Sequence, residues 1–180
     1  MIVPVASFER LQEMASGLGA ALAASMQRRG WQLGRDVAIV VSTDGVHYGE
    51  DFKHTPYGAG GVDAFMKALA FDRGLIRDTL SGCMDASKPS RFFSAVVDAT
   101  HPDTYKVPWC GRYSVPLGSL LIADVARRLG MTAPRGIPLA LGASVDAPQL
   151  ELRDVGLGPT APASLHHFVT HPAIAYVAAD

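Results

Sequence analysis

A short polar segment at residues 42–49 contains the residue types that metal sites and acid–base chemistry use. Its sequence is Ser-Thr-Asp-Gly-Val-His-Tyr-Gly, so the carboxylate of Asp44 lies three positions before the imidazole of His47. These two groups can bind a metal ion together, or act as a base with its orienting partner. The same pattern also fits a simple turn, with Asp44 as a cap and His47 bonded to nearby backbone. The spacing alone leaves both interpretations open.

A second candidate is Cys110, which lies in the segment Trp-Cys-Gly-Arg-Tyr just before a predicted helix. The positive end of a helix dipole lowers the pKa of a nearby thiol and favours the thiolate, which binds metal or attacks carbon. Arg112 would add to this effect and could hold an anionic substrate. Alternatively, Cys110 is simply a small buried residue, as free cysteines often are. Cys83 has no basic neighbour in its Ser-Gly-Cys-Met run, and we expect it to be structural.

Two helices with clear apolar periodicity are predicted at 8–29 and 115–129. The first has Ser7 as its N-cap and ends at Gly30, and the second ends at Gly130. In both helices the apolar residues recur every three or four positions, which builds one face that can pack against the rest of the protein.

Four short apolar runs predict β-strands, at 2–6, 36–42, 137–144 and 173–178. The run at 36–42 is continuous and rich in β-branched residues, which is typical of a strand covered on both faces. Because Asp44 follows directly after this run, the candidate site is expected at the carboxyl end of a strand, where open α/β sheets bind ligands.

Further helices are predicted at 62–82, in two pieces around Asp72, and at 89–100. The segment 154–164 is rich in glycine and proline and is predicted to be a loop. Strands that alternate with helices indicate a single α/β domain over residues 1–180.

The bulk composition excludes several classes of partner. The 16 basic and 17 acidic residues nearly cancel, so nucleic acid and anionic membranes are not expected to bind. Hydrophobic residues make up 48% of the chain and charged residues 18%, which favours a globular protein. No apolar run is long enough to span a bilayer, and no signal-peptide pattern is present. We therefore expect a cytoplasmic protein with both thiols reduced.

Taken together, these motifs resemble those of the Memo-like proteins, a family that includes the B component of the AmmeMemoRadiSam system. That family carries a Ser-x-Asp-x-x-His-aromatic-Gly motif after a strand, which residues 42–49 match. It also carries a Cys-Gly-Arg or Cys-Gly-Tyr element that opens a late helix, which residues 110–112 match. The stretches 2–5, 71–74 and 173–177 look like further elements of the family's second half, so the resemblance covers most of the chain.

The resemblance implies a half-length form of the family's fold, which is similar to class III extradiol dioxygenases. That fold has a central mixed sheet flanked by helices on both faces. The resemblance also implies a metal site at Asp44, His47 and Cys110. The metal would be iron, copper or zinc, and its chemistry would be redox or dioxygenase-like. Cys110 and His47 would then be catalytic, and Arg112 and Tyr48 are predicted to bind substrate.

The family's site also uses histidines from an N-terminal half that this chain lacks. The chain is therefore a fragment, or another subunit completes the site, or the metal function is lost. A half-sheet would expose an edge and an apolar face, which predicts a homo-oligomer or a partner chain. Other histidines could substitute as ligands, and His54 is favoured because it shares a loop with His47. The candidates are His54, His101, His166, His167 and His171.

Two alternatives to the metal site remain open. In a metal-free hydrolase or transferase, Cys110 would be the nucleophile, His47 the general base and Asp44 the residue that orients it. In a binding or scaffold module, the fold would be retained without any chemistry.

Overall fold

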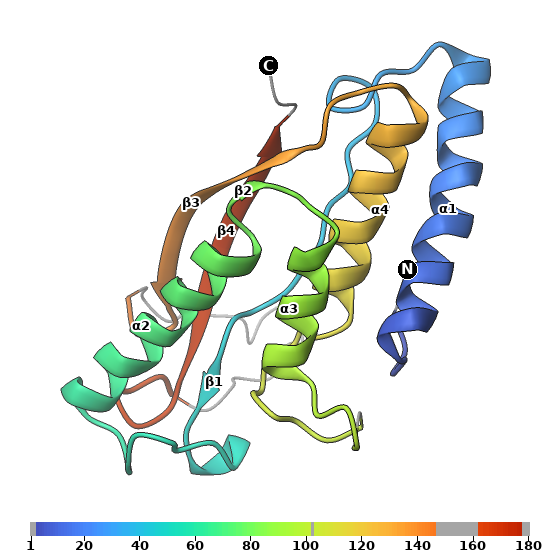
Figure 1. The fold of residues 1–180 in the computed structure, drawn as a ribbon. Coiled ribbons are helices and arrows are strands. Elements are labelled where there is room, and N and C mark those ends of the chain that lie inside the picture. Colours follow the sequence, from blue (N-terminus) through green and yellow to red (C-terminus); the bar gives the residue numbers. More distant parts are fainter. Residues whose placement is uncertain (1–2, 102, 147–161, 178–180) are drawn as a thin grey trace, which may run out of the picture.

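The computed structural model describes residues 3–101, 103–146 and 162–177. Within these ranges the chain folds into four α-helices and one antiparallel sheet of four strands (Figure 1). In chain order the elements are α1 (Phe8–Arg29), β1 (His47–Tyr48), the 3₁₀ turn η1 (Glu50–Phe52), α2 (Val62–Thr79), β2 (Gly82–Cys83), α3 (Ser87–Val96), α4 (Ser114–Arg128), β3 (Arg135–Ala143) and β4 (Phe168–Val177). No helix among the described residues is long and apolar enough to cross a membrane.

The helices α1 and α4 lie side by side along one flank of the molecule (Figure 1). Ser7 caps α1, because its hydroxyl accepts a hydrogen bond from the backbone N–H of Arg10 at 3.2 Å. Gly30 ends the helix in the left-handed conformation, with φ of 65°. The prediction of a helix at 8–29 is therefore confirmed. The buried face of α1 consists of Leu11, Ala15, Gly19, Ala23 and Met26.

The other helices follow the predictions with different boundaries. The predicted break near Asp72 is wrong, because α2 is continuous and buries Asp72 on its inner face. The helix predicted at 89–100 is α3, which begins and ends earlier than predicted. At its start, the Asp85 carboxylate accepts hydrogen bonds from the backbone N–H groups of Ser87 and Lys88. The helix predicted at 115–129 is α4.

The strand order is β1-β4-β3-β2, and every adjacent pair is antiparallel. The long β3–β4 ribbon includes the strand predicted at 137–144 and residues 173–177 of the last predicted strand; residue 178 lies outside the described residues. The prediction of a mixed sheet is wrong for the described strands, because no parallel pair joins them. Most of the predicted loop at 154–164 also lies outside the described residues.

The strand predicted at 36–42 does not form. Alternate side chains of this run do pack toward the core, but Val40 between them is 85% exposed. The segment has the side-chain pattern of a strand, but no other strand of the described chain pairs with it. Residues 3–6 of the first predicted strand are likewise not in a strand. The inward side chains of 36–42 are Val37, Ile39 and Val41.

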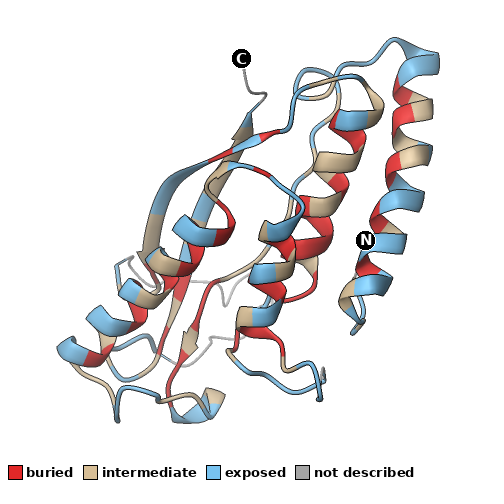
Figure 2. Cartoon of the chain, viewed as in Figure 1, coloured by how far each residue is buried: buried red, intermediate tan, exposed pale blue. Residues whose placement is uncertain are grey.

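Helices cover one face of the sheet more fully than the other. The fully buried centre of the core includes Trp109, Tyr48, Phe92 and Phe168. Figure 2 shows that exposed residues run along much of β3, where Leu139 is 66% exposed. The expectation of helices on both faces is therefore not met by the described residues, and the observed fold is a mixed α/β arrangement with an antiparallel sheet.

Candidate metal centre

The structure brings together the three residues predicted to bind metal. Cys110 Sγ lies 3.1 Å from His47 Nε2, and Asp44 Oδ2 lies 3.6 Å from the same nitrogen. One ligand atom from each residue fits within a group no wider than 4.8 Å. Because His47 and Cys110 are 63 residues apart in the chain, this convergence depends on the fold.

Backbone hydrogen bonds hold the two segments of the centre against each other and against β4. The N–H of His47 donates to Pro108 O at 3.1 Å, which aligns the 44–47 segment with the loop that carries Cys110. On the other side of the 44–47 segment, the N–H of Gly45 donates to the carbonyl oxygen of Thr170 in β4 at 2.8 Å. The candidate ligands therefore lie on backbone fixed on two sides.

A buried carboxylate lies directly behind these segments. Asp72 of α2 is fully buried and accepts hydrogen bonds from Trp109 Nε1 at 2.9 Å, from Val46 N at 3.2 Å and from the hydroxyl of Thr170. Burial raises the pKa of Asp72, although the three hydrogen bonds act in the opposite direction.

The role of Asp72 was not predicted from the sequence, which indicated only a helix break near this residue. The signal that could have found it is a carboxylate on the apolar face of a helix, between Leu69 and Leu75. A charge is costly to bury, so such a residue needs several hydrogen-bond partners in the fold.

The electrostatics of the centre correct one expectation. Loss of hydration raises the pKa of the Cys110 thiol, the Asp44 carboxylate raises it further, and Arg112 lowers it by less than these two together. The expected lowering of the Cys110 pKa is therefore not found, because burial and the nearby Asp44 carboxylate together outweigh the charge of Arg112. Burial also shifts the pKa of His47, in this case downward, and this effect outweighs the opposing charge of Asp44.

His171, and not the favoured His54, is seen in contact with a candidate ligand. His171 Nδ1 lies 3.3 Å from Asp44 Oδ1, the carboxylate oxygen that does not face His47. His54 packs edge-on near Tyr48, at 6.3 Å between ring centroids, and burial lowers its pKa. Outer residues commonly hold metal-binding carboxylates in place, and His171 is positioned to do this for Asp44.

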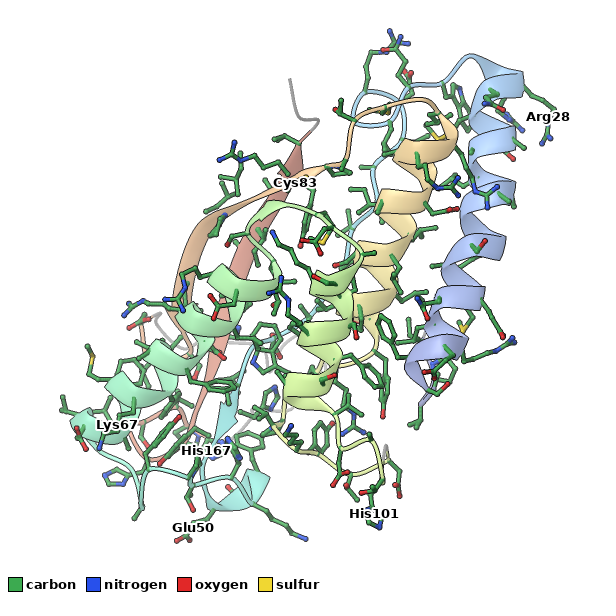
Figure 3. The ribbon with its side chains drawn as sticks, viewed as in Figure 1. Arg28, Glu50, Lys67, Cys83, His101 and His167 are labelled. Atoms are coloured by element: carbon green, nitrogen blue, oxygen red, sulfur yellow. The ribbon has the colours of Figure 1, made fainter. Side chains whose placement is uncertain are left out.

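An aromatic ring separates the centre from a second histidine. Phe52 of η1 packs edge-on against His47, with ring centroids 4.8 Å apart, and stacks on His167 at 4.7 Å. His167 Nδ1 lies 3.5 Å from Asp51 Oδ2. In Figure 3, His167 lies near η1, far from Cys83, which is exposed in β2 at the other end of the sheet. Cys83 is therefore remote from the centre.

The two predicted substrate-binding residues point into the protein. Tyr48 is fully buried, and its hydroxyl donates to Gly58 O at 2.7 Å. Arg112 is 8% exposed, and its guanidinium carbon lies 3.7 Å from the centroid of the Tyr105 ring. Arg112 also donates to Asp103 O at 3.1 Å. A substrate-binding role for Tyr48 and Arg112 stays a prediction, and these positions favour a structural role instead.

The donor set suits a metal ion. A thiol sulfur, an imidazole nitrogen and a carboxylate oxygen together are compatible with zinc, iron or copper. Three protein ligands are the number that catalytic zinc sites commonly use, with a remaining position for water or substrate.

No protein-family model matches the chain, and no curated protein matches it either. The resemblance to Memo-like proteins therefore rests on the motifs at residues 42–49 and 110–112 and on their spacing, and it stays a prediction.

Proposed function

We propose that this protein is a Memo-like metal protein that binds one iron, copper or zinc ion through Asp44, His47 and Cys110. The observation that carries the proposal is the convergence of the three ligand atoms within 4.8 Å from two distant segments. With iron or copper bound, the proposed activity is redox or dioxygenase-like chemistry, in a cytoplasmic protein.

The contacts of Asp44 and His47 support this proposal over a simple turn. In the turn interpretation, Asp44 would cap backbone N–H groups and His47 would bond to nearby backbone. Instead, the two carboxylate oxygens of Asp44 face His47 and His171, and His47 Nε2 faces the sulfur of Cys110. Side chains that face one another in this way are suited to share an ion.

A bound metal ion would supply Lewis-acid or one-electron chemistry at this place. The protein's own residues would hold and orient it. His47 would donate its Nε2 lone pair, Asp44 a carboxylate oxygen, and Cys110 its sulfur after loss of the thiol proton. The Phe52 ring packs edge-on against His47, whose Nε2 faces the other two groups.

Metal content and affinity of the purified protein test the proposal. The protein is loaded with iron(II), copper(I) or zinc, and bound metal is measured by elemental analysis. We expect near-stoichiometric binding of at least one metal, and its loss in the variants Cys110→Ala and His47→Ala. The matched controls are Cys83→Ala and His101→Ala, which change an exposed thiol and an exposed imidazole outside the centre. Absence of binding with all three metals would overturn the proposal.

A metal-free cysteine enzyme is the second candidate, and the distance of 3.1 Å between Cys110 Sγ and His47 Nε2 favours it. In a catalytic triad, however, the carboxylate binds the imidazole nitrogen that does not face the nucleophile. Here Asp44 approaches Nε2, the nitrogen that also faces the sulfur. Two groups on one nitrogen fit a shared ion better than a triad. Fast alkylation of Cys110 at neutral pH without metal would favour the enzyme instead.

We also propose that another chain, or a second copy of this one, covers part of the sheet. The exposed apolar residues Ile137 and Leu139 of β3 support this proposal. Light scattering tests it, and a monomer at all concentrations together with no captured partner would contradict it.

A further inference from the structure

Asp72 connects three segments that are distant in sequence. Its two carboxylate oxygens accept hydrogen bonds from Trp109 Nε1, from the backbone N–H of Val46 and from the hydroxyl of Thr170. Trp109 and Thr170 are 37 and 98 residues from Asp72 along the chain. All three donors are neutral, so Asp72 is not one half of an ordinary buried ion pair.

Each of these partners lies directly before a candidate ligand or before a residue that contacts one. His47 follows Val46, Cys110 follows Trp109, and His171 follows Thr170. A shift of any partner therefore moves the next residue along the backbone. Asp72 itself is too deep to reach an ion beside Cys110, because it is fully buried behind the backbone of these segments.

The fit around the carboxylate is close. A Cβ atom at Gly45 would collide with the Thr170 hydroxyl and with Asp72 Oδ2. The absence of a side chain at Gly45 thus lets the segment that carries Asp44 and His47 pass directly against the carboxylate. This contact fixes the distance between the segment and Asp72 as well as the direction of the segment.

An apolar residue would be the simplest occupant of this position. The neighbouring buried positions of α2 are Ala68, Leu69, Leu75 and Ile76. A leucine at position 72 would avoid the desolvation of a carboxylate but would leave the three donors without an acceptor. The carboxylate gives the site something that packing does not, which is a set of directional contacts to three separate segments.

We propose that Asp72 is the positioning residue of the candidate metal centre. It holds the Asp44–His47 segment, the Cys110 loop and the start of β4 so that the ligand atoms converge before any ion arrives. This inference rests on the proposed metal function for its purpose, but its geometric content can be tested without metal. Outer residues that orient metal ligands typically change metal affinity by about 10- to 100-fold when they are removed.

The experiment compares three variants of the whole chain. Asp72→Asn keeps the shape but leaves at least one donor without its acceptor, and Thr170→Val removes a single donor. Thr79→Val is the matched control, because Thr79 is also buried in α2 and its hydroxyl donates to Leu75 O at 2.6 Å, away from the centre. Zinc affinity is measured by competition with a coloured chelator, and the thiolate absorption of the cobalt(II) protein reports the geometry around Cys110.

We expect zinc binding to weaken by about 10-fold or more in Asp72→Asn and by less in Thr170→Val. The cobalt(II) absorption should change in both. Thr79→Val should lower the melting temperature but leave affinity and absorption as in the wild type. If Asp72→Asn and Thr170→Val melt earlier but bind zinc as the wild type does, Asp72 only supports the fold and the proposal is overturned. Thr170→Val keeps this test decisive if Asp72→Asn fails to fold.

A metal-free measurement separates this proposal from the proposed function. In a Cys83→Ala background, the only thiol is Cys110, and its alkylation rate reports its contact with His47. We expect Asp72→Asn and Thr170→Val to change this rate severalfold, and Thr79→Val to leave it unaltered. A wild type that binds no metal, with these altered rates, would overturn the metal function and retain the positioning role. Unaltered alkylation rates in Asp72→Asn and Thr170→Val would overturn the positioning role.

Discussion

Two carboxylates on different helices join distant parts of the molecule in opposite ways. Asp124 of α4 lies near the surface and pairs with Arg127 and Arg128, and Arg128 also donates to Ser16 of α1 at 3.2 Å. Asp72 of α2 is fully buried and has only neutral donors around it. The first connects two helices, whereas the second connects the segments of the candidate centre.

The two environments shift the pKa values in opposite directions. Partial burial acts to raise the pKa of Asp124, but its arginine partners more than offset this and hold the pKa below its usual range. Burial raises the pKa of Asp72 despite its hydrogen bonds. The partners of Asp124 therefore favour its charged form, whereas the surroundings of Asp72 disfavour the charged form.

Truncation of a large core residue in each region should give the largest effect. Trp109→Ala and Leu11→Ala both remove fully buried side chains. Trp109→Ala should lower the free energy of unfolding by about 3–5 kcal/mol, and Leu11→Ala by about 2–5 kcal/mol. Only Trp109→Ala should also reduce metal affinity, because Trp109 donates to Asp72 and precedes Cys110. Urea unfolding and zinc titration measure the two effects. Equal affinities in both folded variants would remove the distinction between the regions.

Glycine substitution should give a smaller and more selective effect. A Cβ atom at Gly19 would collide with the Asp124 carboxylate, and one at Gly45 with Asp72 and Thr170. Gly45→Ala should cost about 1–3 kcal/mol of stability, because a crowded core resists added atoms. Gly19→Ala should cost less, because the colliding atom is the end of the Asp124 side chain and alanine favours a helix more than glycine does. Metal affinity should fall only in Gly45→Ala. Weaker metal binding in Gly19→Ala as well would indicate that the two regions are coupled.

The pH dependence of stability should differ in sign between the carboxylates, and this is the smallest effect. The raised pKa of Asp72 means that the folded state binds its proton more tightly, so its contribution declines as pH rises above about 4. The lowered pKa of Asp124 means that its contribution is present above about pH 4 and is lost as pH falls further. Urea unfolding of the wild type, Asp72→Asn and Asp124→Asn is measured from about pH 3 to about pH 7, a range that includes the ordinary carboxyl pKa. The differences between wild type and variants give the slope of stability against pH for each carboxylate. Slopes of the same sign would contradict the comparison.

The helix pair could be predicted from sequence because its determinants are local. Ser7 and Gly30 mark the ends of α1, and apolar residues repeat at helical spacing between them. The same holds for α4, which begins at Ser114, within a residue of the prediction. Caps and periodicity act within a few residues, so they can be recognised without knowledge of the fold.

The predicted strand at 36–42 failed because a strand also needs a partner. β-branched residues favour extended backbone, but the backbone of a strand must also form hydrogen bonds with a neighbouring strand. The sequence pattern does not specify which segment that neighbour is. The contacts of Asp72 could not be predicted for a similar reason, because its hydrogen-bond partners lie up to 98 residues away in the sequence. The grouping of His47 and Cys110 was reached only through motif resemblance, and no local pattern places them 3.1 Å apart.

The long sequence separation within the centre has a consequence for folding kinetics. Because the His47–Cys110 contact closes a loop of 63 residues, its entropic cost delays it relative to the formation of α1 or α4. We therefore expect an ion bound there to slow unfolding and to leave the refolding rate nearly constant. Stopped-flow measurements with and without zinc test this hypothesis, and a refolding rate that rises in proportion to zinc affinity would contradict it. The metal would then act mainly on the lifetime of the native state.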